Sequence, residues 1–106
     1  MFVDRKFLTM KEIHLIVLIE VMPGKRDVQI AAYEQLKPLV LAEPGCMQYE
    51  LFADASDGNK FVLLEKWASQ GALDAHDVTP HMVAADARNP TFRAKPATVI
   101  KMTAVT

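Results

Sequence analysis

The side chains of this sequence best suited to catalysis are two histidines and a carboxylate, His76, His81 and Glu65. Imidazole takes up and releases protons near neutral pH, so either histidine is a candidate general base. We expect Glu65 to orient a histidine, or to stay partly protonated if it is deeply buried. The residue types therefore predict proton transfer, with His76, His81 and Glu65 as the catalytic candidates.

A pocket for an aromatic ligand is predicted beside these groups. Alternation along one predicted strand places four side chains on the same face, namely Phe61, Leu63, Glu65 and Trp67. Trp67 offers a flat ring and one N–H donor, although it serves equally well as core filler. Tyr49 can line the same pocket from a neighbouring strand. Four residues are thus predicted to bind substrate: Trp67, Tyr49, Phe61 and Leu63.

Other interpretations of the charged residues remain open. His81 lies two residues after Thr79, an expected helix cap, where the helix dipole favours the neutral, base-competent imidazole. The same position also allows His81 merely to fix the start of the helix. An ion pair with a neighbouring Lys or Arg explains Glu65 equally well. His14 is expected at the surface or in an interface.

No metal site is predicted. His76 and His81 are five residues apart across an expected helix break, and a spacing of four is needed to place two ligands on one helix face. The single cysteine, Cys46, excludes an internal disulfide and a cysteine-based zinc site.

Length and charge indicate one globular domain. The chain has 106 residues and a net charge of -1, without a block of like charges that would attract nucleic acid or a membrane. Charged residues interrupt the first ten residues before any apolar run typical of a signal peptide. We expect residues 1–10 to be an N-terminal extension, residues 11–106 to form the domain, and the protein to be cytoplasmic.

The hydrophobic pattern predicts the order strand–helix–strand–strand–helix–strand. The expected strands are 13–22, 46–53, 60–68 and 97–105, and the expected helices are 25–42, 69–76 and 79–88. Pro38 predicts a kink or an irregular last turn in the first helix. This order is the ferredoxin-like arrangement of the α+β class, a four-stranded antiparallel sheet with its helices on one face.

Apolar side chains on both faces of the predicted sheet indicate a second covering layer. Ile16 and Leu18 point away from the other apolar residues of the first strand, and Val62 and Leu64 do so in the third. Helices can cover only one face, and large exposed apolar patches usually mark interfaces. We therefore predict a homodimer formed through the sheet faces; the alternative is a monomer with an open apolar sheet.

Several segments together resemble the antibiotic biosynthesis monooxygenase domain, and especially the bacterial quinol monooxygenases. The matching segments are Glu43-Pro44-Gly45-Cys46, Tyr49, the strand from Phe61 to Trp67, and Ala72 to Met82. The resemblance spans about residues 12–103. It implies a dimeric α/β-barrel of ferredoxin-like units and a monooxygenase without cofactor. Such an enzyme acts on a small aromatic phenol or quinol that reduces dioxygen once it is deprotonated.

The family also includes other activities. Its haem degraders pair the strand tryptophan with an asparagine and a second histidine, and of that set only Trp67 is present here. Its phosphorylated-sugar isomerases would require cations at the pocket mouth, for which Arg88 and Arg93 are the candidates. A non-catalytic dimeric module that binds aromatic ligands is the third alternative.

Overall fold

The computed structural model describes residues 11–105, so the predicted extension at residues 1–10 lies outside the described part. Within these residues the elements are, in chain order, β1 (Ile13–Glu20), α2 (Arg26–Leu41), β2 (Cys46–Ala53), β3 (Lys60–Trp67), α3 (Gln70–Asp77), α4 (Pro80–Arg88), the 3-10 helix η1 (Asn89–Thr91) and β4 (Thr98–Met102).

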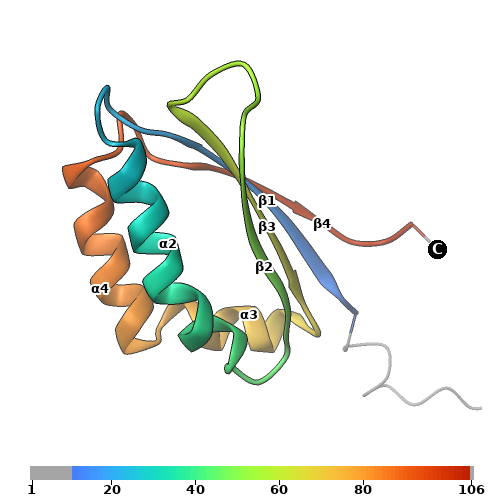
Figure 1. Ribbon diagram of the computed structural model, residues 1–106. Helices are drawn as coiled ribbons and strands as arrows, with labels where there is room; N and C mark the ends of the chain where they lie inside the picture. Colours follow the sequence, from blue (N-terminus) through green and yellow to red (C-terminus); the bar gives the residue numbers. More distant parts are fainter. Residues whose placement is uncertain (1–10, 106) are drawn as a thin grey trace, which may run out of the picture.

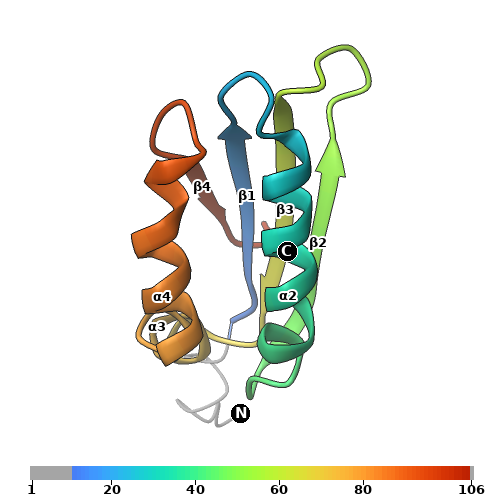
Figure 2. The ribbon, with the colours of Figure 1, turned by 60° about the vertical axis from the view of Figure 1, so that its left-hand side comes forward.

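The four strands form one sheet in the order β2-β3-β1-β4, in which every neighbouring pair is antiparallel. Helices α2 and α4 lie side by side on one face of this sheet, with α3 at their lower end (Figures 1 and 2). This arrangement confirms the predicted ferredoxin-like α+β fold. The sheet is open within the single chain.

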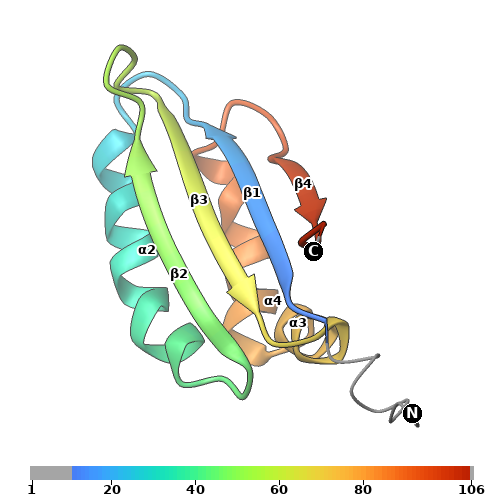
Figure 3. The same cartoon turned by 90° about the vertical axis from the view of Figure 1, so that its right-hand side faces the viewer.

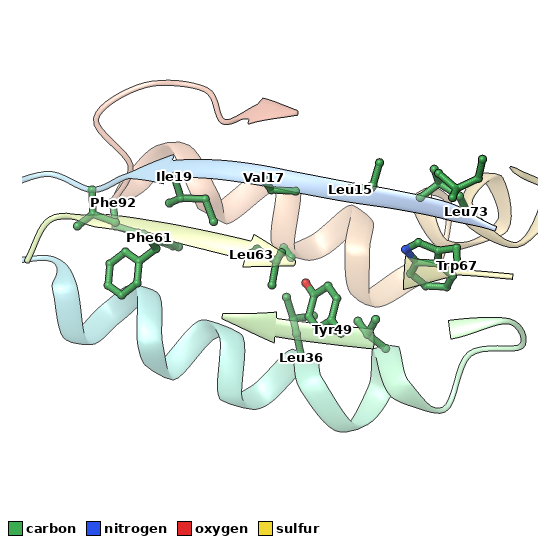
Figure 4. Packing of buried hydrophobic residues seen from close by; sticks show 14 residues of the cluster. Leu15, Val17, Ile19, Leu36, Tyr49, Phe61, Leu63, Trp67, Leu73 and Phe92 are labelled. Carbon is green, nitrogen blue, oxygen red and sulfur yellow. The ribbon is translucent and has the colours of Figure 1, made fainter. Parts of the chain in front are cut away.

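The core lies between the sheet and the helices because alternate residues of the strands point toward the helices. The inward side chains of β1 are 3–7% exposed: Ile13, Leu15, Val17 and Ile19. Figure 4 shows several of them packed against residues of β3 and α2. Leu15 pairs with Glu65 across the sheet, so the strand register carries this carboxylate into the core.

Both predicted helix N-caps form, Ser69 at the start of α3 and Thr79 at the start of α4. The Ser69 hydroxyl accepts a hydrogen bond from the Ala72 N–H at 3.1 Å, and the Thr79 hydroxyl accepts one from the Met82 N–H at 3.3 Å. Thr79 also donates its hydroxyl proton to the His76 carbonyl at 2.9 Å. This second bond ties the end of α3 to the start of α4.

Most element ends lie within one residue of the predicted ranges, and the larger differences are at the ends of β1 and β4. Helix α2 continues through Pro38 to Leu41, and an i→i−3 bond from the Glu43 N–H to the Val40 carbonyl follows it. Strand β1 ends at Glu20 and is followed by a single bridge between Val21 and Arg93.

Strand β4 is shorter than predicted, because it covers Thr98–Met102. Met102 pairs with His14, the second residue of β1, so little of β1 remains to pair with the residues that follow.

Residues 11–105 form no further layer on the face of the sheet opposite the helices (Figure 3). Large apolar side chains are exposed on it, including Leu18 at 42%, Phe52 at 48% and Ile100 at 43%. Ile16, Val62 and Leu64 are half-buried on the same face. The predicted excess of apolar residues on this face is therefore present in the fold.

None of the helices within residues 11–105 is long and apolar enough to span a membrane.

Candidate active site

A cavity of about 410 Å³ lies between the inward face of the sheet and helices α2, α3 and α4. Its size is typical of sites for small molecules. Four of the seven predicted site residues line it: Tyr49, Leu63, Glu65 and His76. Apolar side chains form most of the remaining wall, among them Leu15, Val17, Leu36, Leu73 and Ala85.

His76 is held at the α3 end of the cavity by Glu43. Its Nδ1 lies 3.0 and 2.9 Å from the two carboxylate oxygens of Glu43, and its side chain is 3% exposed. An ionised carboxylate can only accept, so Nδ1 carries the proton and donates. The neutral ring therefore has its lone pair on Nε2, where a general base requires it.

His81 contacts the same carboxylate from α4. Its Nε2 donates to Oε2 of Glu43 at 2.8 Å, and its side chain is 21% exposed. His81 is absent from the cavity lining. The two predicted histidines thus meet through a shared carboxylate, but only His76 borders the cavity.

Glu65 lies on the other side of His76. Its Oε1 accepts a hydrogen bond from the Trp67 Nε1–H at 3.0 Å and lies 3.8 Å from Nε2 of His76. Because 3.8 Å is too long for a hydrogen bond, Glu65 and Nε2 of His76 are not bonded to each other, and both remain free to contact one oxygen atom of a ligand. Burial raises the pKa of Glu65, while Trp67 and His76 act to lower it. Glu65 therefore holds a proton to higher pH than an exposed carboxyl does.

This raised pKa predicts how stability depends on pH. The neutral form of Glu65 stabilises the fold fully below the ordinary value of 4.5, and this contribution is lost as pH rises toward the higher folded-state pKa. Glu65→Gln keeps an acceptor for Trp67 but cannot ionise. Thermal melts from pH 4 upward should show the variant gaining stability relative to the unaltered protein; a constant difference would contradict this.

Trp67 and Phe61 are buried outside the cavity lining. The Trp67 side chain is fully buried, and its ring centre lies 4.5 Å from that of His76. Phe61 lies beneath the guanidinium of Arg26, 5.4 Å from its ring centre. The assignment of Trp67 and Phe61 to substrate binding stays a prediction. Trp67 contacts both Glu65, through a hydrogen bond, and His76, through its ring.

Glu43 is the residue of this site that sequence reasoning missed. In the sequence it precedes Pro44 and Gly45, and it was named above only within a segment of the family resemblance, without a role of its own. The histidines it contacts lie 33 and 38 residues further along the chain. Its place in the matching Glu43-Pro44-Gly45-Cys46 motif was the available signal, because a glutamate is not required to end a helix.

Gly45 allows this turn to approach α3 closely. Its φ is +83°, and a Cβ at this position would lie 2.6 Å from the Cβ of Ala72. Any other residue would therefore be strained and would also push α3 away. The Gly45 carbonyl accepts the Ala68 N–H at 2.8 Å, which fixes the turn beside the start of α3.

Among residues 11–105, no group of three or more His, Cys, Asp and Glu side chains is arranged to hold a metal ion. The two ring nitrogens nearest Glu43 are used as donors to its carboxylate.

The sequence and the fold have clear relatives. Residues 12–88 match the family model described as antibiotic biosynthesis monooxygenase. The chain belongs to this family. It is 34% identical to "Probable quinol monooxygenase YgiN" of Escherichia coli, over 66% of this chain and 77% of that protein.

It is also 33% identical to the uncharacterized protein sll1783 of Synechocystis, over 76% of this chain but only 55% of that protein. Among solved structures, Rv0793 of Mycobacterium tuberculosis superposes with a TM-score of 0.84 at 26% identity, covering 90% of this chain and 96% of that one. YgiN thus carries a monooxygenase name, and Rv0793 has the same fold.

Proposed function

We propose that this protein is a monooxygenase that oxidises a small aromatic phenol or quinol without a bound cofactor. The observation that carries the proposal is the arrangement of Glu43, His76 and Glu65 at one end of an apolar cavity. The family and the printed name of YgiN support an oxygenase acting on an electron-rich aromatic ring.

The reaction begins with proton abstraction. Nε2 of His76 takes the proton of a substrate hydroxyl, and Glu43 stabilises the imidazolium through Nδ1–H. Glu65 in its neutral form donates a hydrogen bond to the same oxygen and stabilises the phenolate. His81 acts through Glu43, because its Nε2–H contacts that carboxylate at 2.8 Å.

The phenolate then supplies the electrons. It transfers one electron to dioxygen, which gives a phenoxyl radical and superoxide. These two radicals combine at a ring carbon to give a peroxide. One oxygen atom of the peroxide becomes a carbonyl of the product. The other leaves as water with the hydrogen atoms given up by that ring C–H and the hydroxyl. Dioxygen thus takes its four electrons from the substrate, and the product is a quinone. The apolar cavity keeps bulk water from the peroxide.

Oxygen uptake tests this function. Purified protein with a panel of hydroquinones and naphthols should consume dioxygen well above the buffer rate and yield one quinone per dioxygen. Treatment with a strong chelator should leave the rate unchanged, since no metal takes part in the proposed steps. Ligand that binds but is recovered unchanged from every incubation would contradict the proposal and indicate a binding module.

We further propose that the outer face of the sheet pairs with a second copy of this chain. The apolar residues of this face are flanked by two lysines and two glutamates, Lys60, Lys66, Glu20 and Glu50. A two-fold interface uses the same patch on both copies, so lysines and glutamates on one face provide partners of both signs for ion pairs between the copies. Two sheets packed in this way would complete the α/β-barrel implied by the family resemblance.

A charge placed in the middle of this face tests the homodimer. Ile16→Lys should shift the molar mass measured by light scattering from that of two chains to that of one, because a buried unpaired ammonium is costly. Lys37→Glu, which changes an exposed residue of α2, is the matched control and should remain dimeric. A single-chain mass for the unaltered protein would overturn this proposal.

A further inference from the structure

A cation lies at the end of the cavity away from the histidines. Arg93 lines the cavity between η1 and β4, and its backbone is bridged to Val21 just after β1. Its Nε donates to Oε1 of Gln29 at 3.1 Å. Within residues 11–105 no carboxylate lies within 4 Å of its guanidinium, and its terminal N–H groups have no hydrogen-bond partner. A guanidinium stays protonated in proteins, so these groups remain available as donors.

Two buried polar groups face the same space. Gln29 and Tyr49 are each 4% exposed and both line the cavity. In the described part of the chain, the Gln29 amide nitrogen and the Tyr49 hydroxyl have no hydrogen-bond partner. Every fully enclosed polar side-chain atom there has one, so these two atoms are open to the cavity. Burial raises the pKa of Tyr49, which therefore keeps its proton and can donate.

Arg93 also stands where the cavity meets a second hollow. A groove of about 560 Å³ lies outside it, lined in part by Met22, Pro90 and Pro96. The two spaces share four residues: Asp86, Asn89, Arg93 and Ala97. The shared residues place Arg93 at the boundary between the two spaces.

We propose that Arg93, together with Gln29 and Tyr49, binds a carboxylate carried by the substrate on the side opposite its reacting hydroxyl. All three donors line the same, mainly apolar cavity, and Arg93, the cation among them, contacts Gln29 directly. A carboxylate accepts two parallel hydrogen bonds from a guanidinium and matches this donor set. This inference rests on the proposed function and narrows its substrate to aromatic acids. Asp86 is exposed and also lines the cavity, so its negative charge would repel a ligand that carries a second negative charge.

Binding measured without dioxygen tests the inference separately from turnover. The probes are 6-hydroxy-2-naphthoate, whose carboxylate lies opposite its hydroxyl, and its neutral amide, 6-hydroxy-2-naphthamide, titrated against the unaltered protein by calorimetry under anaerobic conditions. The acid should bind about tenfold or more tightly than the amide, because hydrogen bonds between charged partners are the stronger ones. The ratio of the two dissociation constants should fall as salt is added.

Substitutions then assign the preference. Arg93→Met keeps an unbranched side chain of similar length and should bring the ratio close to one, whereas Arg93→Lys should retain part of it. Arg88→Met, at an exposed position of α4 outside the cavity, should leave the ratio unchanged. Equal binding of acid and amide by the unaltered protein, or an undiminished ratio in folded Arg93→Met, would overturn the inference. Absence of oxygen uptake would count against the oxygenase alone.

Discussion

Replacing His76 with alanine is expected to lower kcat/KM for oxygen uptake by about a hundredfold to ten-thousandfold, the usual contribution of a general base. The reason is that His76 is the imidazole that borders the cavity, with its Nδ1 proton held by Glu43. The rate should be measured with an oxygen electrode, with the variant and the unaltered protein compared at the same pH and concentration.

Two comparisons separate a chemical role from a structural one. His81→Ala removes the other imidazole bound to Glu43 but not one that lines the cavity, so its loss should be much smaller, about tenfold. Added imidazole should restore part of the activity of His76→Ala by occupying the vacated space. Equal losses in both variants without rescue would assign His76 a structural role.

Glu43→Ala is expected to have the largest effect on stability. Glu43 is 9% exposed and accepts hydrogen bonds from both histidines, so its removal leaves a buried donor on His76 and a partly buried donor on His81 without an acceptor. Each such group costs about 1–3 kcal/mol, which together should lower the free energy of unfolding by about 3 kcal/mol. In a domain of this size, Tm should fall by about 12 °C or more.

Glu43→Gln and Glu34→Ala complete this experiment. A glutamine offers one oxygen acceptor in place of two, so its melting temperature should lie between the unaltered protein and Glu43→Ala. Glu34 is exposed on α2 and should tolerate alanine within about 0.5 kcal/mol. If Glu43→Ala melts like Glu34→Ala, the shared carboxylate contributes nothing to the fold.

The strands and the helix break were predictable because their signals are local. Alternation placed Glu65 on the inward face of β3, and the structure finds it 6% exposed there. Ser69 and Thr79 predicted the starts of two helices, and both hydroxyls accept the expected N-cap hydrogen bonds. Strand alternation and helix caps depend only on residues close together in the sequence, so they can be recognised without knowing the rest of the fold.

Contacts between distant segments were not predictable. The pairing of Glu43 with His76 depends on how the turn after α2 meets α3, which the positive φ of Gly45 controls. Nor does periodicity separate a residue that lines a cavity from one packed behind it. Leu63 and Trp67 share one face of β3, yet only Leu63 borders the cavity.

The shared carboxylate has a consequence for folding. Glu43 belongs to the first half of the chain, with β1, α2 and β2, whereas both histidines belong to the second half, with β3, α3, α4 and β4. The three side chains meet only after the two halves have docked, a contact of long sequence separation that closes late. Glu43, His76 and His81 therefore also connect the two halves of the chain. A destabilising substitution far from the cavity should reduce activity by depopulating the docked state, while each surviving molecule keeps its full rate.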